Sequence, residues 1–378
     1  MFLLTLVSLL LLSASGTVHA RPCVAFDVNW NLLAFGLDNK DWNAGQQPTW
    51  TGSGSASDIT TSGRPPFDGN STTCYLSQYT NAIYVLNGDS KNPSSVYIYD
   101  ATALSWSTQA VDAGTFDISS FDAILDHDTN VFYALSQGTL FHLDMGLLKA
   151  ANSTPLSWVN TEAAPYPSNY VPVMALAQNH IHFLDVPGVP AGSADIFVIH
   201  YSYFQPEAQA YPLPNGSAFP ATFGQTASFF QQDNTARALV QQEFAFIPQD
   251  SSAVYVINVE TNTTQALAGP SVKDPEATYF AGVTSLVQLT SNGVVNFLPY
   301  LEGSGNASTN AAATWSPVSI LTSVAPPSTA TGSSAAPSGT HGSSPSGSSS
   351  GSSGALAMSN VHLGLVLSAV LGAVACLL

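Results

Sequence analysis

A repeat of about fifty residues constrains the fold of this chain more than any other sequence feature. Apolar segments recur around Ile83, Phe132, Ile181, Phe244 and Val294, at spacings of 49, 49, 63 and 50 residues. Each segment belongs to a set of short runs rich in Val, Ile, Tyr and Phe, separated by Gly, Asn, Asp and Pro. This pattern is typical of β-strands joined by tight turns. The repeat therefore predicts an all-β fold in which four-stranded sheets are arranged radially around an axis.

The number of repeats predicts the number of sheets, or blades, in such a β-propeller. The repeat at residues 73–111 is the clearest, with strands expected near 74–76, 82–86, 95–100 and Trp106. Four further repeats follow it, and the segment 24–50 supplies strands for one more. We predict six blades within residues 21–320, and five or seven blades also fit the pattern. One end of the chain is expected to complete the last blade, because an open ring exposes two sheet edges.

The clearest repeat resembles a known family. It contains Ile-Tyr-Val-Leu-Asn-Gly at 83–88, Val-Tyr-Ile-Tyr-Asp at 96–100, and Trp106. These residues resemble a kelch blade of the kind found in the central domain of galactose oxidase. The double glycine of kelch repeats is absent, because Asp89 follows Gly88. The order of segments along the whole chain is similar to that of secreted fungal cell-surface proteins.

Both ends of the chain carry targeting signals. Residues 1–20 are uncharged and mostly apolar, which is typical of a secretory signal peptide. Residues 321–354 consist almost wholly of Ser, Thr, Gly, Ala and Pro, and we predict a low-complexity stalk there. Residues 355–378 end in an apolar tail, so we predict attachment of a glycosylphosphatidylinositol (GPI) anchor near Ser352 and removal of that tail. A membrane-spanning helix is the alternative for the tail.

The cysteines and glycosylation motifs fit an extracellular chain. Cys376 lies in the predicted tail, so Cys23 and Cys74 remain as the pair that can form a disulfide. Five Asn-x-Ser/Thr motifs predict N-glycosylation at Asn70, Asn152, Asn215, Asn262 and Asn306. We therefore predict an extracellular protein at the cell surface, anchored by GPI to the plasma membrane or transferred to the cell wall.

The charge of the chain excludes one class of partner. The formal net charge is −17, and the 7 Lys and Arg residues are scattered along the sequence. Such a surface repels phosphate backbones, so no nucleic acid is expected as a partner. The expected partners are a glycan or a protein at the cell surface, and the membrane through the lipid anchor.

Three tryptophans near the N-terminus are candidate ligand-binding residues. Trp30, Trp42 and Trp50 stand among asparagines and an aspartate. Aromatic rings stack on sugar rings while neighbouring polar groups bond the hydroxyls, so this mixture favours a glycan ligand. Packing of the three rings inside a blade is the alternative interpretation.

Three histidines are candidate metal ligands. His180 and His182 alternate along one expected strand and so share a face, and His200 follows on the next strand. Three imidazoles would suit zinc or copper. The alternative is a strand with one polar, solvated face. The segment from Asp126 to Asn130 also contains ligand-type residues, but its place between two strands favours a hairpin turn.

The galactose oxidase resemblance implies a copper radical site, which requires a cysteine crosslinked to a tyrosine. If Cys23 and Cys74 form a disulfide, neither is available, so we predict no cofactor and no catalytic residue. The expected function is a non-catalytic binding module for a glycan or protein. One alternative is a secreted carbohydrate-active enzyme, an oxidase or a hydrolase, with carboxylates such as Asp27, Asp100 or Asp144 at the channel. Another is a structural cell-wall protein.

Overall fold

The computed structural model describes residues 21–69, 71–231 and 240–325. The chain divides into two compact units, residues 1–329 and 330–378, and every described residue belongs to the first. The predicted signal peptide, Asn70, the stalk beyond residue 325 and the tail that follows Ser352 lie outside the described residues.

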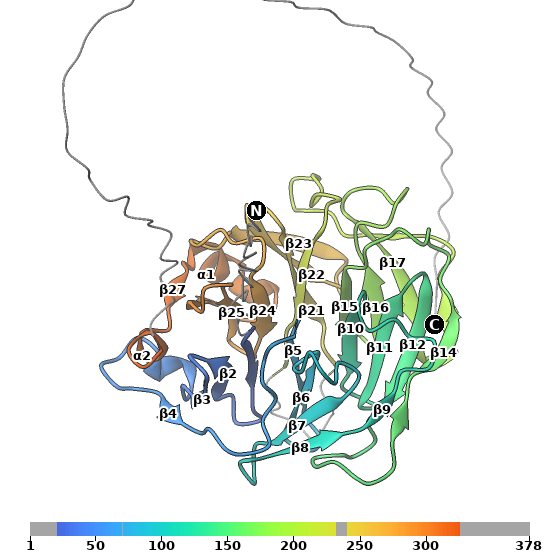
Figure 1. Ribbon diagram of the computed structural model, residues 1–378. Helices are drawn as coiled ribbons and strands as arrows, with labels where there is room; N and C mark the ends of the chain where they lie inside the picture. The colour runs from blue at the N-terminus through green and yellow to red at the C-terminus, as the bar shows by residue number, and fades with distance from the viewer. Residues whose placement is uncertain (1–20, 70, 232–239, 326–378) are drawn as a thin grey trace, which may run out of the picture. The chain divides into compact units, whose positions relative to one another are not determined.

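Six antiparallel sheets, numbered here as blades in chain order, each come from one continuous stretch of chain (Figure 1). Blade 1 contains β1 (Cys23–Phe26), β2 (Leu32–Leu37), β3 (Lys40–Asn43) and β4 (Ser57–Asp58). Blade 2 contains β5 (Thr73–Ser77), β6 (Ala82–Leu86), β7 (Val96–Asp100) and β8 (Ser105–Gln109). Blade 3 contains β10 (Asp122–Asp126), β11 (Val131–Ser136), β12 (Thr139–Asp144) and β14 (Val159–Ala163).

The second half of the chain repeats this order. Blade 4 contains β15 (Met174–Ala177), β16 (His180–Phe183), β17 (Ser193–Val198) and β18 (Tyr203–Phe204), and β17 also pairs with β19 (Gln209–Ala210). Blade 5 contains β20 (Gly224–Ser228), β21 (Glu243–Pro248), β22 (Ala253–Asn258) and β23 (Thr263–Ala268). Blade 6 contains β24 (Thr278–Ala281), β25 (Ser285–Leu289), β26 (Val295–Pro299) and β27 (Ser316–Pro317).

Short elements complete the described chain. A two-stranded parallel sheet joins β9 (Val111–Asp112) to β13 (Leu156–Ser157). The helical segments are η1 (Gln47–Thr49), η2 (Ile199–Tyr201), η3 (Ser304–Asn306), α1 (Ala307–Ala312) and α2 (Ser319–Thr322).

The first strands of the six blades form a closed inner ring. β1 contacts β5, β5 contacts β10, and the series continues through β15, β20 and β24 back to β1. A separate apolar core fills each of the six junctions between neighbouring blades. At two of them, Tyr84 packs on Phe132 and Phe35 packs on Tyr99. The prediction of a six-bladed propeller is confirmed, because every blade buries its apolar faces against both neighbours.

The ring closes without exchange of strands, so the expectation that one end of the chain completes the last blade is wrong. Blades 1 and 6 each supply their own four strands. Their junction is closed by apolar side chains of both blades, among them Val24 and Phe297. In α2, the Ile320 N–H donates to Trp50 O (3.3 Å) and the Ile320 oxygen accepts the Ala56 N–H (3.4 Å). Packing of side chains thus replaces the sheet pairing that we expected.

The sequence repeat predicts that Val294 marks the second strand of blade 6, and the structure differs from this by one strand. Val294 precedes β26, the third strand of blade 6, whereas the other reference residues lie in second strands. The first strand, β24, has the sequence Thr-Tyr-Phe-Ala and is mostly half-buried, so no continuous apolar run marks it. Its partner β25 is buried along its whole length, so the continuous apolar run before Val294 marks the second strand of the blade.

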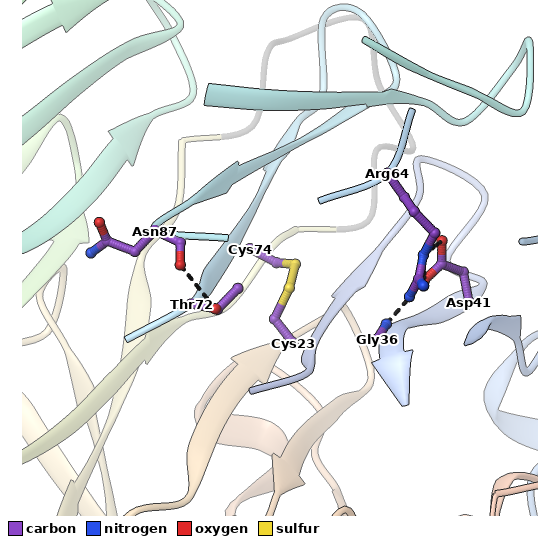
Figure 2. Close-up of a disulfide and its surroundings, with 7 residues drawn as sticks. All are labelled: Cys23, Gly36, Asp41, Arg64, Thr72, Cys74 and Asn87. Carbon is purple, nitrogen blue, oxygen red and sulfur yellow. Dashed lines mark hydrogen bonds and ion pairs between the residues drawn. A yellow bond between two sulfur atoms is a disulfide. The ribbon is translucent and has the colours of Figure 1, made fainter. Parts of the chain in front are cut away.

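A disulfide joins the first two blades. Cys23 of β1 and Cys74 of β5 are bonded, with their Cα atoms 5.8 Å apart, which confirms the predicted pair (Figure 2). Because β1 and β5 are neighbours in the inner ring, the disulfide fastens the N-terminal blade to the next one.

A buried ion pair lies beside this junction. The Asp41 side chain is fully buried, and Arg64 Nη2 approaches its Oδ1 at 2.8 Å (Figure 2). The Gly36 N–H donates to the same oxygen (3.0 Å), and the Trp106 indole N–H of blade 2 donates to Oδ2 (3.2 Å). Asp41 therefore connects blade 1 to blade 2 and to the chain between them.

Candidate functional site

The structure separates the three candidate tryptophans. Trp42 and Trp50 are 6% and 0% exposed. Their indole N–H groups donate to the backbone oxygens of Leu37 (3.0 Å) and Gly45 (2.9 Å). Both rings therefore belong to the packed interior and do not form a shared ligand surface with Trp30. Trp30 is half-buried and lies in the turn between β1 and β2.

A cleft of 480 Å³ lies where blade 1 meets blade 6, and we call it the closure cleft. Of the aromatic residues that line it, Trp30 is half-buried, whereas Phe26 and Trp50 are 2% and 0% exposed. The ring centroid of Phe26 lies 6.4 Å from that of Trp30 and 6.0 Å from that of Trp50. None of the lining residues is charged. The polar side chains around the cleft are those of Gln46, Gln47, Thr284, Ser285, Thr309 and Asn310.

The backbone at Trp30 is held in an uncommon conformation. Its φ of 62° lies in the left-handed region, which bulky side chains rarely occupy. Asp27 holds the turn, because its Oδ1 accepts the N–H groups of Asn29 and Asn31, each at 2.9 Å. Such a conformation costs of order 1–3 kcal/mol and is concentrated at functional sites. Asp27 thus stabilises the turn that contains Trp30. The sequence offered it as a possible catalytic carboxylate at the channel, and the structure gives it this structural role instead.

Two glutamines give the closure cleft its hydrogen-bonding groups. Gln46 Nε2 donates to the Asn29 oxygen at 2.8 Å. The Thr284 hydroxyl of blade 6 donates to Gln47 Oε1 of blade 1 at 2.5 Å. Within the described part of the chain no hydrogen bond engages Gln46 Oε1 or Gln47 Nε2. The Gln46 amide oxygen and the Gln47 amide NH2 group therefore remain for a ligand.

The three candidate histidines do not form a metal centre. His182 is 1% exposed and lies against the rings of Tyr211 and Phe244. Burial lowers its pKa to about 3. His200 Nε2 instead lies 3.2 Å from Nδ2 of Asn179. Over residues 21–69, 71–231 and 240–325, no three His, Cys, Asp or Glu side chains are grouped so that they could hold a metal ion. The structure therefore does not assemble the predicted site of His180, His182 and His200.

Several aspartates that resemble ligands or catalytic groups hold turns. Residues 126–130 connect β10 to β11, as predicted, and the Thr129 hydroxyl donates to Asp126 Oδ2 (2.5 Å). After the third strands of blades 2 and 3, Asp100 and Asp144 accept backbone N–H groups two residues further along, at 2.8 and 2.7 Å. Asx turns of this kind stabilise hairpins, so these carboxylates are structural.

A second cavity, of 560 Å³, lies between the first strands of all six blades, and we call it the central channel. Asp122, the first residue of β10, lies at the end where these strands begin. Its Oδ2 accepts the Met174 N–H (2.7 Å) and its Oδ1 the Ala123 N–H (2.9 Å). Burial raises the pKa of Asp122 to about 7. Sequence reasoning missed Asp122, and the available signal was a single carboxylate inside the apolar run 121–125.

The predicted glycosylation sites differ in accessibility. Asn152, Asn215 and Asn262 are exposed. Asn306 is half-buried, and its Nδ2, the atom that would carry a glycan, donates to the Glu302 oxygen at 2.7 Å. Glycosylation at all of these sites stays a prediction.

Two further observations bear on function. Because Cys23 and Cys74 are bonded to each other, neither is free to crosslink a tyrosine as a copper radical oxidase requires. Among the described residues no helix is long and apolar enough to cross a bilayer.

No known protein family and no curated protein matches the sequence. Solved structures that are similar include "Structure of YjhT", with a TM-score of 0.49 and 10% identity, covering 78% of this chain and 96% of that one. Another is "Crystal structure of Nidogen/Laminin Complex", with a TM-score of 0.40 and 8% identity, covering 66% and 79%. The six blades themselves define a β-propeller, an architecture that serves binding and enzyme-like modules.

Proposed function

We propose that this chain is a GPI-anchored extracellular glycoprotein whose kelch-like propeller binds a glycan, without catalysis, at the cell surface or wall. The observation that carries the proposal is the closure cleft. It presents the half-buried ring of the strained Trp30, and amide and hydroxyl groups surround that ring without any charged side chain. Aromatic faces stack on sugar rings, and uncharged amides bond their hydroxyls. A neutral oligosaccharide is therefore the ligand that this cleft suits best.

The anchor and the location rest on the sequence. An apolar tail after a Ser-rich segment, three exposed sequons and a disulfide all suit a secreted chain. Treatment of intact cells with a phosphatidylinositol-specific phospholipase C should release the protein into the medium. If the protein stays on cells whose wall was removed before the phospholipase treatment, that result would contradict a lipid anchor.

The glycan proposal is tested by binding of the purified full chain to an array of neutral wall oligosaccharides. Trp30→Ala should weaken binding at least tenfold, which corresponds to about 1.4 kcal/mol. Trp315→Ala is the matched control, because Trp315 is also half-buried but packs on Tyr279 between blades 5 and 6. Equal loss in both variants would refute a site at Trp30.

The other two functions are outcomes of the same experiment. Turnover of a bound oligosaccharide would make the protein a carbohydrate-active enzyme. Failure of the wild-type chain to bind any glycan would refute the proposal and favour a protein ligand or a structural role in the wall.

A further inference from the structure

The central channel differs in chemistry from the closure cleft. Near the end where the six first strands begin, it is lined by polar side chains such as Thr73, Asp122 and Gln225. Further along the same strands the lining is apolar and includes Leu76, Leu125 and Leu176, here called the leucine wall, which also belong to the cores of three junctions. The volume of 560 Å³ lies within the range of roughly 300–1,000 Å³ that is usual for small-molecule sites. The channel therefore offers the Asp122 carboxylate beside an apolar surface, and its other two charged lining residues, Arg21 and Glu276, pair with each other.

Asp122 has no cationic partner in the described chain. Each of its oxygens accepts one backbone N–H and keeps lone pairs for a further donor. None of the ion pairs among the described residues includes Asp122. Arg21, which also lines the channel, is bound to Glu276 at 3.3 Å. Asp122 is half-buried, and a carboxylate partly withdrawn from water without a counter-charge is costly, so a bound cation would offset that cost.

We propose that the central channel binds a small ligand with a primary ammonium group, which pairs with the Asp122 carboxylate while an alkyl chain lies against the leucine wall. An ammonium group has three donors and no acceptor, which matches the free lone pairs of a carboxylate. The site goes beyond the glycan proposal, because it is a separate cavity and selects for positive charge. The two proposals therefore fail independently.

The site is expected to respond to pH. Burial raises the pKa of Asp122 to about 7, so the fraction of carboxylate rises about tenfold between pH 6 and pH 8. The titratable groups that feel its charge are Tyr75 on β5 and Tyr170 before β15, and burial holds the pKa of both hydroxyls well above its usual value. Both tyrosines stay neutral in this range, and an alkyl ammonium stays charged. Asp122 is thus the group that changes the affinity.

The test is calorimetric titration of the purified full chain with pentylamine and with 1-pentanol, its neutral analogue. We expect pentylamine to bind at least tenfold more tightly than pentanol at pH 8, and to lose about tenfold in affinity at pH 6. Equal binding of the two probes, no binding of pentylamine, or pH-independent binding would each overturn the proposal. These measurements need no variant, so they hold even if a variant fails to fold.

Two variants sharpen the test. Asp122→Asn should abolish the preference for pentylamine and its pH dependence. Asp38→Asn removes the same charge from an exposed turn, where asparagine tolerates the left-handed φ of 52°, and it should leave both unchanged. Retention of the preference in Asp122→Asn, or its loss in Asp38→Asn, would contradict the assignment.

Discussion

Blade 1 meets its two neighbours in different ways. At the junction with blade 2, a disulfide joins the inner strands and the buried Asp41 binds Arg64 at 2.8 Å (Figure 2). At the junction with blade 6, the ion pair between Arg21 and Glu276 spans 3.3 Å with side chains 46% and 60% exposed. Apolar packing and hydrogen bonds, such as that from the Ile320 N–H to the Trp50 oxygen, hold this second junction together.

The comparison explains where the proposed ligand site lies. Covalent and buried ionic links require close approach of the groups that they join, so they fasten blade 1 to blade 2. At the junction of blades 1 and 6, apolar packing, hydrogen bonds and one exposed ion pair join the blades, and the closure cleft lies there. Segments of lower local stability are also where ligand-binding elements are commonly found.

Removal of the disulfide should have the largest effect on stability. The bond closes a loop with a sequence separation of 51 residues. In the chain-entropy model, such a loop is worth about 4 kcal/mol. Denaturant unfolding of the double variant Cys23→Ala/Cys74→Ala should show a loss of that size. A loss below about 1 kcal/mol would mean that the junction between blades 1 and 2 does not depend on the disulfide.

Arg64→Ala should have the next largest effect. It leaves the fully buried Asp41 carboxylate without its cation, which costs about 3 kcal/mol. The free energy of unfolding from urea titration measures this. The double variant Arg64→Ala/Asp41→Ala provides the control, since it also removes the orphaned charge and should recover part of the loss. An undiminished loss in the double variant would contradict the electrostatic explanation.

A small deletion at the closure should have a moderate and local effect. Ile320→Val removes one methylene from the core shared by blades 1 and 6 and should cost about 1 kcal/mol. Amide exchange should accelerate at Ala56 and Ile320, which bond across this junction, and remain unchanged in β5. Equal acceleration in β5 would show that the two junctions open together.

Arg21→Ala should have the smallest effect. Because both partners of the Arg21 to Glu276 pair are exposed, the change should cost no more than about 0.5 kcal/mol. Thermal unfolding at low and high salt measures it, and the small difference from wild type should vanish at high salt. A cost equal to that of Arg64→Ala would remove the distinction between the two junctions.

The local parts of the fold were predictable from the sequence. The four strands of blade 2 were expected because apolar runs and turn residues such as Asn87 and Asp100 mark each strand and turn. The disulfide followed from the two cysteines outside the tail. Strand β24 and the mode of closure were not predictable, because a half-buried inner strand lacks a clear pattern and closure depends on contacts between distant residues.

The candidate site was predictable only in part. The tryptophan-rich segment marked the correct blade, but sequence alone did not distinguish Trp30 from Trp42, since burial of an indole depends on tertiary packing. The unusual φ of Trp30 arises from the Asp27 turn, which the local sequence does not reveal. Asp122 was missed because its exposure to the channel depends on how six strands are arranged around it.

The most direct test of the glycan site is hydrogen exchange of the full chain with and without the oligosaccharide that binds best on the array. We predict slower exchange in residues 27–31, 46–50 and 283–285, which meet at the closure cleft from blades 1 and 6. Exchange at β5, on the far side of blade 1 from this cleft, should not change. Protection confined to any other face of the propeller would contradict the closure cleft as the glycan-binding site.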